Sequence, residues 1–209
     1  WSDVYASLAL AADRTSRIRV GTGVAVAATR PAPVTAAAIA SINQIAPGRT
    51  FLGIGTGNTA MRIMGHKPMT MAEFDDYLTV LRPLLRGDEA EYAWRGRSSP
   101  IRHIMADDGF VNFADPIPLY VSGFGPKSLR LAGKHGDGAV LSVPPHASFM
   151  ERVWTGVERG ASADGTAIDR SDFFTCSLST IVVLDDGEAT DAPPTGRARM
   201  GTTLEGDTA

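Results

Sequence analysis

The chain has 209 residues, of which 44% are hydrophobic and 21% charged, as is ordinary for a globular protein with one sizeable core. Its formal net charge of −3 argues against a protein that binds nucleic acid, because such proteins need a surplus of basic residues. A single cysteine, Cys176, excludes an internal disulfide framework and a multi-cysteine metal site. Apolar runs are too short to span a bilayer. We therefore expect a reducing, cytoplasmic setting with no membrane partner.

The first part of the sequence alternates between helix and strand patterns. Residues 2–15 predict an amphipathic helix that begins with capping side chains. Residues 18–26 are apolar with glycines near their end, which is typical of a strand. A second helix is expected over 33–46, because proline suits a first helical turn and Pro-Gly follows the segment. Residues 50–55 predict the next short strand.

The middle of the sequence contains one strong helix signal. After a connecting loop, Thr70 and Glu73 have the spacing of a capping box, in which each side chain satisfies a backbone amide of the other residue. Apolar residues then recur at steps of three and four, which predicts an amphipathic helix that ends before Gly87. Residues 88–115 show no clear period, so we expect a loop there.

Helix and strand patterns are again recognisable in the last third of the chain. Residues 118–122 and 138–143 predict strands, with a helix from Pro126 between them. A further helix is expected over 147–158, and the apolar run 173–184 predicts a buried strand.

Strands that alternate with helices and are almost continuously apolar indicate parallel pairing with both faces covered. The sequence therefore predicts one β/α domain over residues 1–184. Residues 185–209 are rich in Gly, Thr, Asp, Pro and Arg, which predicts a loosely ordered tail.

Three of the predicted strands end in clusters of glycine. In parallel β/α folds, ligands bind at the carboxyl ends of the strands, where glycine permits a close approach of the backbone. One such cluster alone is more simply explained as a tight turn, whereas three together favour a ligand site. The clusters are Gly21-Thr22-Gly23, Gly53-Ile54-Gly55-Thr56-Gly57 and Gly123-Phe124-Gly125.

Two of these segments resemble sites for phosphorylated ligands. Residues 55–60 match the G-x-G-x-x-A dinucleotide fingerprint, but the acidic residues at the right distance, Asp75 and Asp76, lie inside a predicted helix. A barrel loop is therefore favoured over a Rossmann domain. Pro126 begins a helix whose first-turn amides can bind an anion, and Lys127 can add charge, although a solvated lysine is its simpler role.

The remaining residues that could act in catalysis or metal binding do not show the sequence patterns that such roles require. The four histidines lack metal-ligand spacing and are expected at surface or loop positions. Asp107-Asp108 precedes a glycine and indicates a turn, and Cys176 is expected to pack in a strand. No G-x-S-x-G elbow surrounds a serine, which argues against a hydrolase.

An ordered set of segments resembles the luciferase-like monooxygenase superfamily. The similarity is greatest to its deazaflavin-dependent branch, which includes methylenetetrahydromethanopterin reductase and the glucose-6-phosphate dehydrogenases that use coenzyme F420. The segments that carry the resemblance are 18–24, 29–31, 47–57, 71–87, 119–127 and 136–138.

The resemblance implies a (β/α)₈ barrel with the cofactor ring at its carboxyl-terminal mouth. A complete barrel typically needs about 250 residues. The chain maps onto strands three to seven, so we expect an incomplete barrel whose other strands lie before Trp1 and beyond Ala209. A bulge with a non-prolyl cis peptide is implied at Gly23-Val24. The residues implied to bind the cofactor are Gly23, Val24, Gly55, Thr56, Gly57, Asn58, Ser122, Gly123, Phe124, Gly125 and Pro126.

The function implied by the resemblance is hydride transfer between coenzyme F420 and a small organic substrate, by a protein that forms a homodimer. The first alternative is a monooxygenase that uses reduced FMN. A second is a non-catalytic cofactor-binding barrel or an inactive fragment, and a third is a barrel enzyme that binds phosphate without flavin. Several deazaflavin relatives carry Asp or Glu where this chain has Asn58, and a neutral amide cannot act as a general acid. Catalytic residues are therefore unassigned, with Asn58 as a candidate.

Overall fold

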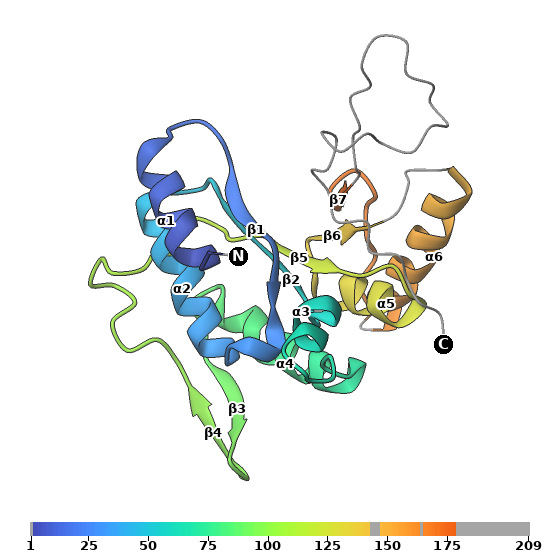
Figure 1. Ribbon diagram of the computed structural model, residues 1–209, viewed down its shortest axis with the longest axis horizontal. Coiled ribbons are helices and arrows are strands. Elements are labelled where there is room, and N and C mark those ends of the chain that lie inside the picture. Colours follow the sequence, from blue (N-terminus) through green and yellow to red (C-terminus); the bar gives the residue numbers. More distant parts are fainter. Residues whose placement is uncertain (1, 143–146, 164, 179–209) are drawn as a thin grey trace.

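A single parallel sheet of five strands organises the computed structural model, which describes residues 2–142, 147–163 and 165–178 (Figure 1). The strands are β1 (Val20–Val26), β2 (Thr50–Gly55), β5 (Leu119–Ser122), β6 (Gly138–Leu141) and β7 (Phe174–Ser177). They lie in the sheet in the same order as in the chain. A doubly wound fold reverses its strand order, whereas a barrel does not, so this sheet is a segment of a β/α barrel.

Five long helices pack against one another in chain order and cover one face of the sheet (Figure 1). Their apolar stripes meet side chains from alternate positions of the strands, such as Leu52, Leu119 and Leu141, which are almost completely buried. The helices are α1 (Val4–Arg14), α2 (Ala32–Ile45), α4 (Met71–Leu84), α5 (Pro126–His135) and α6 (Ala147–Ala163).

The helix and strand predictions for the first half of the chain are confirmed. Asp3 caps α1 by accepting a hydrogen bond from the amide of Ala6 at 2.9 Å. The capping box at the start of α4 is complete, because the Thr70 hydroxyl accepts from the Glu73 amide and the Glu73 carboxylate accepts from the Thr70 amide. The sequence-level cap signals therefore located these helix starts to within a residue or two.

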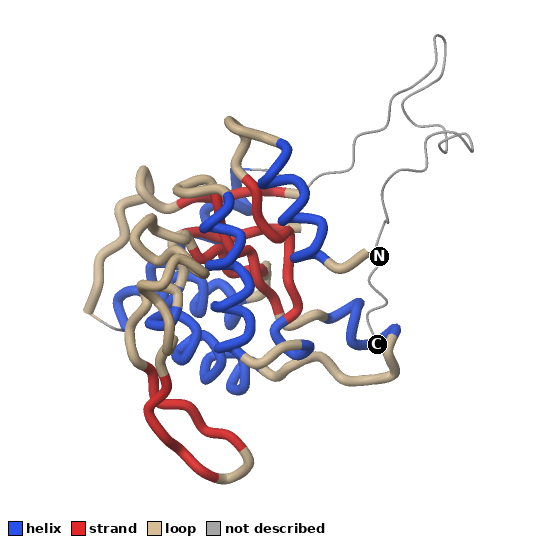
Figure 2. Tube along the Cα trace, turned by 90° about the vertical axis from the view of Figure 1, so that its left-hand side faces the viewer, coloured by secondary structure: helices blue, strands red, loops and turns tan. Residues whose placement is uncertain are grey.

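The prediction of a loop over residues 88–115 is wrong, because this segment contains an antiparallel hairpin. Strands β3 (Ala90–Trp94) and β4 (Arg97–Ile101) pair over their whole length and project from the body of the molecule (Figures 1 and 2). Arg95 and Gly96 form the two-residue turn with φ values of 51° and 77°, and positive values at both positions are what a type I′ hairpin turn requires. Arginine is an uncommon residue at positive φ, which is why the turn was not predicted.

Three smaller expectations also need correction. The connecting loop after β2 contains a short helix, α3 (Asn58–Ile63). His135 is neither a surface nor a loop residue, since its side chain lies in α5 and is only 8% exposed. In the segment predicted as a buried strand over 173–184, β7 ends at Ser177 and Phe174 is 43% exposed, because β7 lies at the end of the strand order. The tail predicted over 185–209 and the domain boundary at 184 lie outside the described residues.

Helices α5 and α6 approach each other closely through glycines. A Cβ atom at Gly133 of α5 would lie 1.9 Å from the carbonyl oxygen of Val157, and one at Gly160 of α6 would lie 1.9 Å from that of Arg130. Side chains at these positions would push the helix backbones apart. The two glycines therefore fix how closely α6 sits on α5, the helix that follows β5.

We predict that Gly160→Ala lowers the free energy of unfolding by about 1–3 kcal/mol, because the methyl group overlaps the Arg130 carbonyl. Alanine is otherwise the better helix former by about 1 kcal/mol, so the sign of the change shows which effect dominates. Urea denaturation measures it. The control Ser162→Ala changes an exposed position of the same helix and should stay within about 0.5 kcal/mol. A stabilised Gly160→Ala protein would contradict the close approach.

Candidate functional site at the carboxyl ends of the strands

The ends of β1, β2 and β5 bring three of the predicted site residues together. A Cβ atom on Gly55 would lie 3.2 Å from the Cβ of Ser122 and 3.4 Å from a methyl carbon of Val24. These residues therefore border one another on the sheet face opposite the helices. We call the surface formed by Gly23, Val24, Gly53, Gly55 and Ser122 the glycine shelf.

A bulge in β1 shapes the shelf. The pairing of β1 with β2 shifts register between Thr22 and Ala25, and the peptide bond between Gly23 and Val24 is cis, as the family resemblance implied. The hydroxyl of Thr22 donates a hydrogen bond to the carbonyl oxygen of Gly53 and is completely buried. Gly23 is exposed, and no atom lies within 4 Å of the position that its Cβ would occupy. The shelf is therefore open above Gly23.

The loop after β2 forms one rim of the shelf. Gly57 has a φ of 78°, and a Cβ there would lie 2.2 Å from a methyl carbon of Val26, so that only glycine fits. Thr56 is half-buried, whereas Asn58 is exposed at the start of α3, where its Oδ1 accepts a hydrogen bond from Nε of Arg62 at 3.0 Å. Arg62 was not predicted as a site residue. Its position four residues after Asn58 is nevertheless a signal that a sequence can show, because side chains four residues apart meet on a helix.

The loop after β5 forms the second rim. The amide of Gly123 donates to the carbonyl of Val140 at 3.2 Å, which holds this loop against β6. Phe124 is 61% exposed and points away from the core. Pro126 is in the first turn of α5, and the N-cap residue Gly125 provides no side-chain cap, so among the described residues the first-turn amides have no capping side chain. This arrangement agrees with the helix start predicted from the sequence.

A ladder of aromatic rings lies beside the shelf on the same face of the sheet, toward the amino ends of the strands. The ring centroids of Phe51 and Tyr120 are 5.2 Å apart, and those of Tyr120 and Phe174 are 4.6 Å apart. Arg19 donates to the Tyr120 hydroxyl at 2.9 Å and lies over both the Phe51 and Tyr120 rings. On this face of β2 and β5 the residues therefore change from bulky rings to glycine and serine toward the carboxyl ends of the strands.

The helix that carries the second rim is anchored to α4 by Asp75. Lys134 Nζ lies 2.8 Å from the Asp75 carboxylate, and Nε2 of His135 contacts the same oxygen atom. Partial burial raises the pKa of Asp75, but the hydrogen bonds from Lys134 and His135 together lower it by more. The net pKa of this carboxyl lies below its ordinary value, which means that the ionised form stabilises the fold.

Two kinds of feature are not found in the part of the chain that the structure describes. No group of three or more His, Cys, Asp or Glu side chains there is placed to hold a metal ion. None of its helices has the length and apolar character needed to cross a membrane.

Comparison with known proteins identifies the family. A model of the luciferase-like monooxygenase family matches residues 1–197. The chain belongs to this family. It is 30% identical over 175 residues to the 5,10-methylenetetrahydromethanopterin reductase of Methanolobus tindarius, covering 78% of this chain and 48% of the reductase. It is 32% identical over 175 residues to the F420-dependent glucose-6-phosphate dehydrogenase of Gordonia bronchialis, covering 78% and 50%. The chain thus spans about half the length of these curated relatives.

Solved structures agree with the barrel fold of this luciferase-like chain. The coenzyme F420 dependent tetrahydromethanopterin reductase of Methanopyrus kandleri matches with a TM-score of 0.65 and 22% identity, over 85% of this chain and 54% of the reductase. The oxygenating constituent of the 3,6-diketocamphane monooxygenase of Pseudomonas putida, solved with FMN, matches with a TM-score of 0.63 and 20% identity. This match covers 83% of this chain and 51% of the monooxygenase. At such identities the likeness shows the fold alone.

We predict that the stabilising effect of Asp75 depends on pH in a defined direction. A carboxyl with a lowered folded pKa contributes stability above its unfolded pKa of about 3.9 and loses it as the pH falls through the folded value. Asp75→Asn should therefore be less stable than the wild type near neutral pH, and the difference should shrink toward zero as the pH falls to about 2.

Urea denaturation of both proteins across this pH range measures the effect. Asp76→Asn, at the exposed neighbouring position of α4, is the matched control and should show little difference from the wild type at any pH. A difference for Asp75→Asn that stays constant with pH would contradict the assigned ion pair.

Proposed function

We propose that this chain is the cofactor-holding part of an oxidoreductase that transfers a hydride between coenzyme F420 and a small organic substrate. The observation that carries the proposal is the glycine shelf at the carboxyl ends of β1, β2 and β5, where barrel enzymes place their active sites. The two relatives described above, a methylenetetrahydromethanopterin reductase and an F420-dependent dehydrogenase, support it.

The shape of the shelf fits a flat ring. Gly23 is exposed, whereas Gly53 and Gly55 are buried. The side chain of Val24 lies against both of these glycines and offers an apolar surface to one side of a bound ring. A planar, largely apolar ligand can therefore approach the backbone at Gly23, whereas a side chain at position 23 would occupy the same space.

The second rim suits an anionic group on the same ligand. In the part of the chain that the structure describes, no side chain caps the start of α5, and the positive end of the helix dipole favours negative charge there. Lys127 is exposed on the same turn and can approach such a group. Ser122, Gly123, Phe124, Gly125 and Pro126 are assigned to this contact.

When bound, the deazaflavin supplies the hydride chemistry, and the protein supplies binding, orientation and exclusion of water. We assign an orienting role to Asn58. Its Oδ1 is engaged by Arg62, which leaves the Nδ2 hydrogens to donate to a ligand, and a neutral amide does not deliver a proton as a general acid. By family resemblance we further propose that the protein works as a cytoplasmic homodimer.

Fluorescence titration of the purified chain with coenzyme F420, and separately with FMN, tests the proposal. We expect saturable binding of F420 and much weaker binding of FMN. A preference for FMN would replace the proposal with the reduced-FMN monooxygenase, whose fold is shared. Binding of simple phosphorylated metabolites without either cofactor would instead favour a phosphate-binding barrel. F420 binding without turnover of any hydride acceptor would leave a non-catalytic cofactor-binding chain.

A variant at the shelf locates the binding. Gly23→Ala adds one methyl group where no protein atom lies within 4 Å, so the fold should be preserved while a ring seated on the shelf is displaced. We expect F420 to bind at least about tenfold more weakly, equivalent to about 1.4 kcal/mol. Ala6→Val adds bulk on the exposed side of α1 and should leave binding unchanged. Unaltered F420 affinity in Gly23→Ala would place the ring elsewhere.

A further inference from the structure

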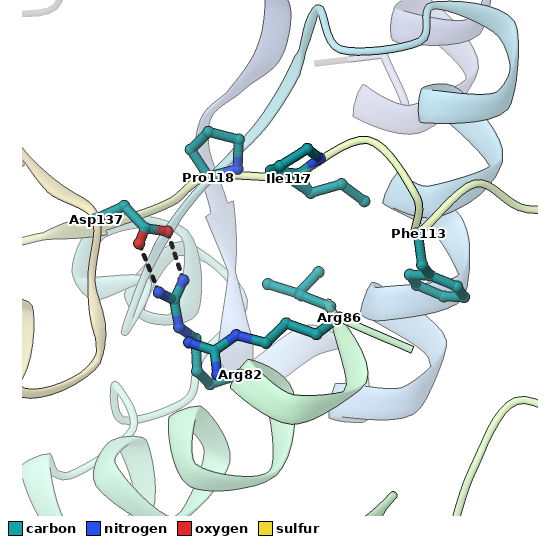
Figure 3. A pocket seen from close by; sticks show the side chains of 8 residues that line it. Arg82, Arg86, Phe113, Ile117, Pro118 and Asp137 are labelled. Atoms are coloured by element: carbon teal, nitrogen blue, oxygen red, sulfur yellow. Dashed lines mark hydrogen bonds and ion pairs between the residues drawn. The ribbon is translucent and has the colours of Figure 1, made fainter. Parts of the chain in front are cut away.

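A pocket lies at the amino ends of β5 and β6 (Figure 3). The glycine shelf is at the opposite end of the strands. Its volume is about 390 Å³, within the range of small-molecule sites. The last turn of α4 and the two residues that follow the helix form one wall, and the segment that leads into β5 forms the other. The lining residues are Arg82, Leu85, Arg86, Phe113, Pro116, Ile117, Pro118 and Asp137.

The charges in this pocket are not balanced. Both terminal nitrogens of Arg82 contact the two carboxylate oxygens of Asp137, which also accepts a hydrogen bond from the Leu119 amide at 2.8 Å. Asp137 is therefore fully engaged. Arg86 lines the same pocket and extends toward the Arg82 guanidinium (Figure 3), yet it makes no ion pair or side-chain hydrogen bond with any residue that the structure describes. One positive charge remains for a ligand.

The remaining walls are apolar and held in place before any ligand arrives. Asn43 Nδ2 donates to the carbonyls of Asn112 and Asp115, each at 2.9 Å, and Asn112 Nδ2 donates to the Asp115 carboxylate. This network fixes the ends of the segment that presents Phe113. The Phe113 ring also packs on His103, with centroids 4.6 Å apart. A pre-formed wall lowers the ordering cost of binding.

We propose that this pocket binds a small carboxylic acid with an aromatic or branched apolar body. The planar guanidinium of Arg86 matches a carboxylate in a two-point contact, and the rings of Phe113 and the adjacent prolines match an apolar body. A bare phosphate would leave the apolar walls uncovered, and an uncharged hydrocarbon would leave Arg86 without a counter-charge.

The simpler explanation of this region is structural. Arg82 and Asp137 tie α4 to the start of β5 and β6, and the amino-terminal face of a barrel commonly serves stability. That explanation accounts for Arg82 and Asp137 but gives no role to Arg86, which is exposed and takes no part in the tie. The proposal rests on Arg86 together with the apolar walls of the pocket that it lines.

The test is a titration of the full chain with benzoate, in which binding is measured by ligand-observed NMR and by calorimetry. Benzyl alcohol and inorganic phosphate are the comparison probes. Benzyl alcohol keeps the aromatic ring without the negative charge, and phosphate keeps a negative charge without an apolar body. We expect saturable benzoate binding and weaker binding of both comparison probes. Arg86→Gln should weaken benzoate binding by about tenfold or more, since it removes a charge-assisted hydrogen bond.

Two further variants decide where the probe binds. Arg159→Gln removes an exposed arginine from α6, which does not line the pocket, and should leave benzoate affinity unchanged. Phe113→Ala should weaken benzoate but not phosphate. No benzoate binding, equal loss in Arg86→Gln and Arg159→Gln, or phosphate binding as tight as benzoate would each overturn the proposal. Benzoate affinity should be unaltered in Gly23→Ala, which separates this pocket from the cofactor site.

Discussion

The close approach of β1 and β2 at the β1 bulge is the constraint on which the candidate site depends. A Cβ on Gly53 would lie 2.2 Å from the carbonyl oxygen of Thr22, so a side chain there cannot coexist with the bulge. The Thr22 hydroxyl holds the two strands together at this point by donating to the Gly53 carbonyl. Because the strands meet in this way, Val24 is displaced over the glycines and Gly23 faces open space.

The helix layer then determines where the rim loops stand. Helix α5 is the next element after β5, and it is held on one side by the glycine contacts with α6 and on the other by Asp75 of α4. A displacement of α5 would carry the segment from Ser122 to Pro126 with it. The interactions that stabilise the fold therefore also position the residues assigned to the anionic part of the ligand.

Much of this arrangement can be predicted from the sequence, because apolar periodicity and helix caps are local signals. The alternation of helix and strand, the capping box at Thr70 and the glycines at the strand ends all belong to this class. The bulge at Gly23 followed only from the family resemblance, since nothing in the residues themselves distinguishes a bulge from a tight turn.

What the sequence did not reveal depends on contacts between distant residues or on uncommon backbone geometry. The pairing of His135 with Asp75 joins residues 60 positions apart, so no local pattern could place that histidine in the protein interior. The hairpin escaped prediction because Arg95 takes the positive φ that a turn normally assigns to Asn, Asp or Gly. The pocket around Arg86 is likewise assembled from three separate segments.

The central claim is that the glycine shelf receives the ring of a deazaflavin. A crystal structure of the chain with coenzyme F420 tests it most directly. The account predicts the ring against Gly23 and Val24, beside Gly55, with an anionic group of the cofactor near the first turn of α5. A ring bound at the amino ends of the strands, or on the helix-covered side of the sheet, would contradict it.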